Sequence, residues 1–127
     1  MFKGLEILIV DDIFVNRMLL IEIAENLEAN YSEARNGKEA IEWLKIKKFD
    51  VVFMDIEMPV MNGFETTRFI RKQMQKPICD MPILAITAHN TTELNKNFVE
   101  SGFTLILSKP YTLEKIERAL MKILNKE

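Results

Sequence analysis

The sequence predicts an α/β fold: a doubly wound, five-stranded parallel sheet with helices on both faces. Two observations support this prediction. Short apolar runs rich in β-branched residues alternate five times with segments whose apolar residues recur at helical spacing. The apolar runs are continuous rather than alternating, which is typical of strands buried on both faces. Since no repeat or linker interrupts the pattern, we expect residues 1–127 to form one domain.

Four of the apolar runs are predicted to be strands buried on both faces, and a weaker fifth run is predicted to be a short strand at an edge of the sheet. The strong runs are Leu5–Val10, Val51–Met54, Ile83–Ile86 and Leu105–Leu107, and the weak one is Tyr31–Ala34. Helices must connect parallel strands by right-handed crossovers. The carboxyl ends of the strands therefore share one edge, where such sheets bind their ligands.

Five segments between and after the strands have helical periodicity. They are Val15–Glu28, Lys38–Lys47, Gly63–Met74, Thr91–Ser101 and a last helix that Thr112 caps and that continues through Leu124. The fourth segment offers few apolar contacts, and Gly102 follows it as a C-cap. We therefore expect it to be among the more mobile elements.

Composition excludes several classes of function. The hydrophobic share is 48%, the charged share is 28% and the net charge is −2, with both signs interleaved along the chain. No basic stripe predicts direct nucleic-acid binding. No apolar run approaches the ~20 residues that span a bilayer, and no signal peptide is recognisable, so we expect a cytoplasmic protein without membrane insertion. A lone Cys79 and a lone His89 exclude an internal disulfide and a multi-histidine zinc site.

Polar residues stand at the carboxyl ends of the predicted strands. They are Asp11 and Asp12 after the first strand, Asp55 after the third, Thr87 after the fourth and Lys109 after the fifth. Three carboxylates in one crevice repel one another and favour a bound cation, and oxygen ligands suit Mg²⁺. A carboxylate nucleophile beside a cation, a hydroxyl and an ammonium group fits phosphoryl transfer to Asp55. Each residue alone has an ordinary explanation, as a helix cap or a loop residue, but chance does not explain all five.

Four separated motifs carry a resemblance to a known family. They are Ile-Val-Asp-Asp at 9–12, Phe-Met-Asp-Ile-Glu-Met-Pro-Val-Met-Asn-Gly at 53–63, Ile-Thr-Ala at 86–88 and Leu-Ser-Lys-Pro at 107–110. Over essentially its whole length the chain resembles the receiver domain of two-component response regulators, and is similar to receivers of hybrid histidine kinases and phosphorelays. The resemblance implies a flavodoxin-like sheet with strand order 2-1-3-4-5. It also implies that a histidine kinase or a histidine phosphotransfer domain donates the phosphoryl group.

The resemblance assigns roles to individual residues. Those it implies for the metal are Asp11, Asp12, Asp55 and the backbone carbonyl of Glu57, and those it implies for the phosphoryl group are the acceptor Asp55 with Thr87 and Lys109. Pro110 matches a residue that follows the lysine through a cis bond, and Gly63 matches a small residue in the loop after the acceptor. The domain is expected to accept and slowly lose its own phosphoryl group, so we do not expect an enzyme that turns over a separate substrate.

One position departs from the family pattern. Ile106 occupies the place where these proteins usually have an aromatic residue that swings inward on phosphorylation. Either Ile106 simply fills the same core slot, or the aromatic half of the switch is missing. Tyr111 is an aromatic residue nearby, but it cannot be assumed to replace that ring. Glu57 and His89 flank the site and are expected to influence the lifetime of the phosphoryl group.

The sequence is also compatible with two other functions. One is a receiver-like interaction domain that is never phosphorylated, although no polar residue of the site is missing. The other is a Mg²⁺-dependent phosphatase with Asp55 as nucleophile, for which the chain has no room for a substrate-covering cap. Three apolar residues after the acidic pair, Ile13, Phe14 and Val15, are predicted to lie at the mouth of the crevice and to bind the donor protein. We expect at most a weak homodimer.

Overall fold

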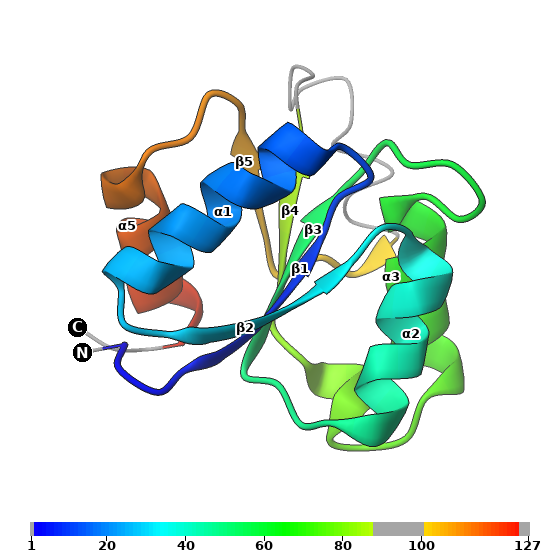
Figure 1. Cartoon of the computed structure of the whole chain (residues 1–127). Coiled ribbons are helices and arrows are strands. Elements are labelled where there is room, and N and C mark those ends of the chain that lie inside the picture. The colour runs from blue at the N-terminus through cyan, green and yellow to red at the C-terminus, as the bar shows by residue number, and fades with distance from the viewer. Residues whose placement is uncertain (1, 88–100, 125–127) are drawn as a thin grey trace.

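The computed structural model describes residues 2–87 and 101–124. Five parallel strands form one sheet in the order β2-β1-β3-β4-β5, which confirms the predicted fold and strand order (Figure 1). The strands are β1 (Glu6–Val10), β2 (Asn30–Ala34), β3 (Val51–Asp55), β4 (Ile83–Thr87) and β5 (Leu105–Ser108). The predicted weak strand is β2, and it does lie at an edge of the sheet.

Four α-helices and one short 3₁₀ helix lie within the described residues. They are α1 (Phe14–Asn26), α2 (Gly37–Ile46), α3 (Gly63–Gln73), η1 (Ile78–Asp80) and α5 (Leu113–Ile123). The sequence analysis missed η1. The predicted helix over Thr91–Ser101 falls, apart from its last residue, outside the described part of the chain. Gly102, which was expected to end it, has a positive φ of 90°.

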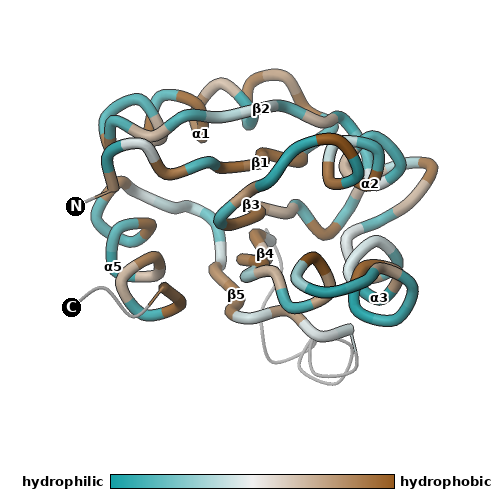
Figure 2. Tube along the Cα trace, turned by 90° about the horizontal axis from the view of Figure 1, so that it is seen from below, coloured by the Kyte–Doolittle hydropathy of each residue, from teal (hydrophilic) through white to brown (hydrophobic). Residues whose placement is uncertain are grey.

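The helices form two layers around the sheet. α1 and α5 cover one face, and α2 and α3 cover the other (Figures 1 and 2). Successive side chains of a strand point to opposite faces, so Ile7 and Ile9 of β1 pack toward α1 and α5. Leu8 and Val10 pack toward α2 and α3. All four are fully buried, which explains why the strands read as continuous apolar runs.

Local sequence fixes where three helices begin. The side chain of Asn36 accepts a hydrogen bond from the backbone N–H of Glu39 at the start of α2. Asn62 and Glu65 form a reciprocal capping box at the start of α3. Thr112 caps α5, as predicted. Each cap satisfies backbone donors that would otherwise lack a partner, and so sets the helix boundary.

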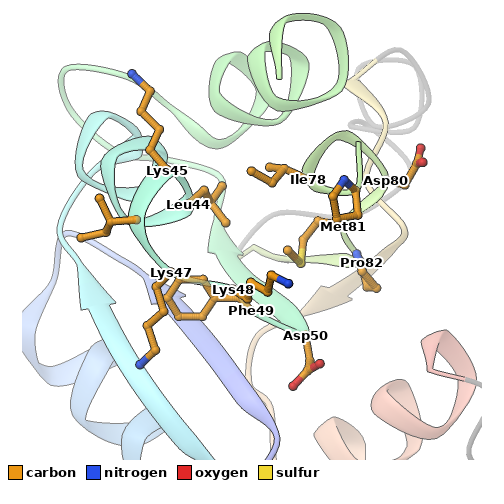
Figure 3. A pocket seen from close by; sticks show the side chains of 12 residues that line it. Leu44, Lys45, Lys47, Lys48, Phe49, Asp50, Ile78, Asp80, Met81 and Pro82 are labelled. Atoms are coloured by element: carbon orange, nitrogen blue, oxygen red, sulfur yellow. The ribbon is translucent and has the colours of Figure 1, made fainter. Parts of the chain in front are cut away.

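The amino ends of β3 and β4 lie at the edge of the sheet opposite to the predicted site. A cavity of about 630 Å³ opens there, between the end of α2 and the segment that contains η1 (Figure 3). None of the helices in the described residues is both long enough and apolar enough to cross a membrane.

Candidate functional site: a carboxylate cluster at the carboxyl edge of the sheet

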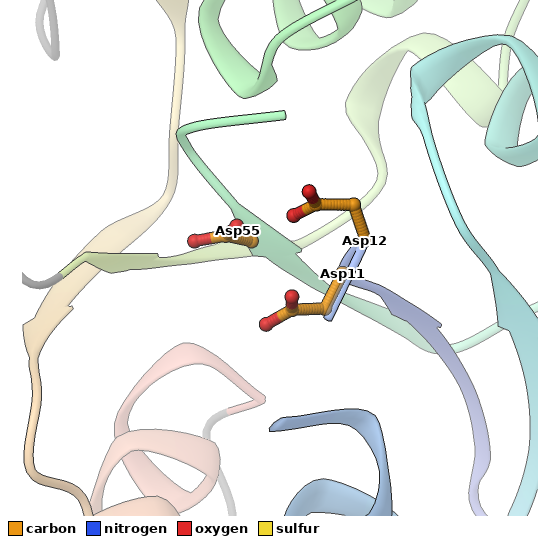
Figure 4. A group of neighbouring side chains, drawn as sticks. All are labelled: Asp11, Asp12 and Asp55. Carbon is orange, nitrogen blue, oxygen red and sulfur yellow. The ribbon is translucent and has the colours of Figure 1, made fainter. Parts of the chain in front are cut away.

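Three carboxylates meet at the carboxyl ends of β1 and β3. The two strands are paired in parallel register, with Val10 beside Met54, so the residues that follow β1 lie next to Asp55 at the end of β3. One oxygen from each of Asp11, Asp12 and Asp55 lies within 4.8 Å of the other two (Figure 4). The structure thus brings together the three acidic residues that the sequence placed at one edge of the sheet.

The cluster is electrostatically unfavourable without a cation. Only 6% of Asp55 is exposed. Burial, together with the negative charges of Asp11 and Asp12, raises the pKa of its carboxyl group to about 7, although the ammonium group of Lys109 acts in the opposite direction. Burial also raises the pKa of Asp11, although the N–H of Ile13 donates to its Oδ1 at 2.9 Å and lowers it. Carboxylates held in this way gain from a positive ligand.

Two oxygens of the cluster are buried without a hydrogen-bond partner among the described residues. They are Oδ2 of Asp11 and Oδ1 of Asp12. Buried polar atoms in folded proteins almost always have a partner, so two unpaired oxygens at one place suit the binding of a cation. Carboxylate oxygens are the preferred ligands of hard divalent cations. This donor set fits Mg²⁺.

A hydroxyl group and an ammonium group border the carboxylates: Thr87 ends β4, the strand beside β3, and Lys109 follows β5, the next strand along the sheet. Thr87 ends β4 and is 1% exposed. Its backbone carbonyl accepts a hydrogen bond from the N–H of Lys109 at 2.7 Å. The Nζ of Lys109 lies 3.6 Å from Oδ1 of Asp55. The peptide bond between Lys109 and Pro110 is cis, as the family resemblance implied.

The loop after β3 packs closely against the acceptor strand. A Cβ atom added to Gly63 would lie 2.6 Å from the carbonyl oxygen of Asp55 and 2.8 Å from the Cα of Ile56, so any larger residue would push the loop away. This close approach is the physical reason for a glycine at the position. Glu57 lies in the same loop with an exposed side chain, and its charge also raises the pKa of Asp55. His89 lies outside the described residues.

Arg17 is a residue of the site that the sequence analysis did not single out for a role. It lies on α1, is only 8% exposed, and donates from its Nη1 to the carbonyl oxygen of Asp11 at 2.9 Å. Its Nε donates to Glu33 of β2 at 3.1 Å. The guanidinium carbon also lies 5.7 Å from the ring centre of Phe14. Arg17 therefore links the backbone of the acidic pair to the first turn of α1.

Ile106 and Tyr111 lie in different apolar clusters. Ile106 is partly buried and packs toward α2 and α3. Tyr111 packs toward α1 and α5, and its hydroxyl donates to the carbonyl of Asn16 at 3.4 Å. Burial, followed by the charges of Asp11 and Asp55, raises the pKa of Tyr111 to about 12. Tyr111 therefore does not occupy the packing position of Ile106.

Comparison with known proteins places this geometry in a family. The profile of the response regulator receiver domain matches residues 7–121 of the chain. The chain belongs to this family. The receiver domain is 36% identical over 117 residues to hybrid signal transduction histidine kinase A of Dictyostelium discoideum. This match covers 91% of this chain and 5% of that protein. It is 32% identical over 118 residues to the autoinducer 2 sensor kinase/phosphatase LuxQ of Vibrio cholerae, covering 93% of this chain and 13% of LuxQ. The chain thus spans only a small part of these relatives.

Solved structures of receiver domains have the same fold. The receiver domain of a sensor histidine kinase from Pseudomonas aeruginosa PAO1 is 28% identical, with a TM-score of 0.88 over 97% of this chain and 99% of that one. That structure holds a magnesium ion in its active-site cleft. The receiver domain of Saccharomyces cerevisiae Ssk1, in complex with the histidine phosphotransfer protein Ypd1, is 26% identical, with a TM-score of 0.84 over 97% of this chain and 90% of that one.

Proposed function

We propose that this receiver domain accepts a phosphoryl group from a phosphohistidine onto Asp55 in the presence of Mg²⁺. One observation carries the proposal: three carboxylates lie within 4.8 Å of one another, and the ammonium group of Lys109 lies 3.6 Å from Asp55. Asp11, Asp12 and Asp55, together with the backbone carbonyl of Glu57, would hold the ion. When bound, Mg²⁺ supplies positive charge that offsets the charge of the phosphoryl oxygens and of the three carboxylates.

The transfer is a substitution at phosphorus. An oxygen of the Asp55 carboxylate attacks the phosphorus atom and forms the new O–P bond, while the N–P bond of the phosphohistidine breaks. The electron pair of that bond stays on the imidazole nitrogen of the donor, which takes a proton from solvent. Asp55 must be ionised to attack. A positive ligand that lowers its raised pKa therefore also increases the fraction of molecules in which Asp55 is ionised and can react.

Two side chains would bind the transferred group. The ammonium of Lys109 is partly exposed and already faces Asp55, so it can pair with a phosphoryl oxygen on the acceptor. Thr87 ends the neighbouring strand, and its hydroxyl would donate to a second phosphoryl oxygen. Phosphorylation adds about two negative charges at this edge of the sheet. The change at Thr87 would then extend into the chain that follows it.

An apolar surface on α1 would bind the donor protein. It consists of exposed apolar residues at the N-cap and in the first two turns of α1: Ile13 is 51% exposed, Phe14 63%, Val15 65%, Met18 45% and Leu19 48%. Exposed apolar side chains gathered in one place are typical of protein contacts. The surface begins two residues after Asp11, so a protein bound there could bring a histidine to the crevice. The yeast complex shows that a related receiver domain binds a histidine phosphotransfer protein.

The proposed role is that of a signalling switch that stores or relays a phosphoryl group. We propose that residues 1–127 form one receiver domain and that its donor is a histidine kinase or a histidine phosphotransfer domain. Such kinases use ATP, so the domain would work in the cytoplasm. The full-length relatives are hybrid histidine kinases, among others, and the chain covers 5% to 13% of the two described above.

Transfer from a panel of phosphorylated histidine donors tests this function. We expect at least one donor to lose its phosphoryl group to the wild-type chain, only when Mg²⁺ is present, and to retain it when Asp55→Asn replaces the wild type. Glu42→Gln removes one exposed carboxylate of α2 that is not part of the carboxylate cluster, and serves as the matched control. Binding of a donor without any transfer would instead favour a domain that acts by contact alone.

A further inference from the structure

The cavity at the amino edge of the sheet is a separate feature from the carboxylate site. Its apolar wall includes Leu44, Phe49, Ile78, Met81 and Pro82. Phe49 immediately precedes Asp50 and β3, and Pro82 immediately precedes β4, so the cavity lies at the opposite ends of the strands that carry Asp55 and Thr87. A volume of about 630 Å³ falls within the range of about 300 to 1,000 Å³ that small-molecule sites occupy.

The acidic groups around this cavity are already engaged. Oδ2 of Asp50 accepts a hydrogen bond from the backbone N–H of Glu6 at 2.8 Å. Burial lowers the pKa of the half-buried Arg71, and the negative charge of Asp80 opposes this shift, so Asp80 and Arg71 attract each other. In Figure 3 the carboxylates of Asp50 and Asp80 point outward, away from the apolar wall. Neither acidic group therefore balances positive charge inside the mouth.

Of the three lysines that line this cavity, only Lys47 forms an ion pair with the described residues. Nζ of Lys47 pairs with Oε1 of Glu6 at 3.2 Å and lies 5.5 Å from the ring centre of Phe49. Lys45 and Lys48 form no ion pair with the residues that the structure describes. In Figure 3 the side chain of Lys45 points away, whereas that of Lys48 runs along the apolar wall. The mouth thus combines an apolar wall with an unpaired ammonium group.

We propose that this cavity binds a small amphipathic carboxylate with an aromatic or short aliphatic body. The body would pack among Phe49, Met81 and Ile78, where a thioether and an aromatic ring offer adaptable contacts. The carboxylate would pair with the ammonium group of Lys48 at the mouth. An apolar wall with one placed charge is the usual composition of a small-molecule site, in which the apolar part gives affinity and the charge gives orientation.

Trp43 provides a built-in reporter of this cavity. It is the only tryptophan of the chain, and its ring packs edge-on against Phe49 at a centroid distance of 6.3 Å. Its indole N–H, the only one in the chain, gives a single NMR signal. This group donates to the carbonyl of Glu33 at 2.8 Å. A ligand that contacts Phe49 should shift that signal. The carboxylate site, at the other edge of the sheet, should not respond.

The test is an NMR titration of the whole chain with naphthoate, and with naphthalenemethanol as the neutral compound of the same shape. We expect naphthoate to shift the signals of Trp43, Phe49 and Ile78, and to bind more tightly than the alcohol. Lys48→Gln should weaken naphthoate about threefold, the size of one exposed ion pair, and leave the alcohol unchanged. Lys38→Gln, an exposed lysine at the other end of α2, should change neither.

Three results would overturn the proposal. The first is the absence of shifts around Phe49 at millimolar naphthoate. The second is a set of shifts confined to the exposed apolar residues of α1. The third is equal binding of the acid and the alcohol, which would show that Lys48 selects no charge. Ile78→Phe provides an independent check, because the larger ring should fill the cavity and abolish the shifts while the chain stays folded.

Discussion

Replacing the acceptor should stabilise the metal-free domain. In Asp55→Asn the side chain keeps its size but loses its charge, and with it the repulsion from Asp11 and Asp12. The pKa of Asp55 is about 7 in the folded chain, against an ordinary value of 3.8. This difference corresponds to about 4 kcal/mol at pH 8, as an upper limit. The lost attraction to Lys109 and relaxation of the cluster reduce it, so we expect a gain of about 1 to 3 kcal/mol.

The sign of the pH dependence follows from the raised pKa. A carboxyl group whose pKa is higher in the folded chain favours folding while it is protonated, and this contribution is lost as the pH rises through about 7. The wild type should therefore lose stability relative to Asp55→Asn between pH 5 and pH 8. Addition of Mg²⁺ should reverse the order, because the ion binds the intact carboxylate cluster more tightly than the variant.

Urea unfolding followed by circular dichroism, at pH 5.5 and pH 8 with and without Mg²⁺, measures the free energy of unfolding of each protein under these four conditions. Glu42→Gln is the control for the loss of one exposed carboxylate and should differ little from the wild type. A variant that is less stable than the wild type at pH 8 without Mg²⁺ would refute the reasoning. So would a difference between them that does not change with pH.

Three further predictions follow from the site. Asp12→Ala should weaken Mg²⁺ binding by at least tenfold, measured by isothermal titration, because it removes one ligand oxygen; unchanged affinity would exclude Asp12 as a ligand. Phe14→Ala should slow transfer from a phosphorylated histidine protein several-fold and leave labelling by acetyl phosphate intact, whereas equal loss with both donors would indicate a structural role. Arg17→Gln should cost about 1 to 3 kcal/mol of stability and weaken Mg²⁺ binding, since the backbone carbonyl of Asp11 loses its buried donor. The control Arg35→Gln, at an exposed arginine, should have neither effect. Equal effects of the two substitutions would contradict a specific role of Arg17 at the site.

Most of the fold could be predicted because the strands other than β2 are mainly apolar on both faces. Val51–Asp55, for example, is buried at every position, so its sequence has no polar residue until the strand ends. For the same reason the carboxylate cluster was predictable: in a parallel sheet the first polar residue after a strand lies at a shared edge, and Asp11 and Asp55 meet there.

Features that depend on long-range contacts were not predictable. Arg17 has the spacing of an ordinary helical residue, and only the fold brings it to Glu33 and to the carbonyl of Asp11. The helix η1 is a three-residue turn without periodicity. The cavity beside it is built from two segments that are far apart in the sequence, the end of α2 with the loop after it and the segment that contains η1. Both interpretations of Ile106 stay predictions, since the preceding predicted helix lies, apart from its last residue, outside the described residues.

The identity of the phosphorylated residue tests the account most directly. Wild type, Asp55→Asn and Glu42→Gln are each incubated with acetyl phosphate and Mg²⁺, and their intact masses are measured. The account predicts the added mass of one phosphoryl group on the wild type and on Glu42→Gln, its absence from Asp55→Asn, and its absence from all three when Mg²⁺ is chelated. Equal labelling of Asp55→Asn, or a wild type that stays unlabelled in Mg²⁺, would contradict it.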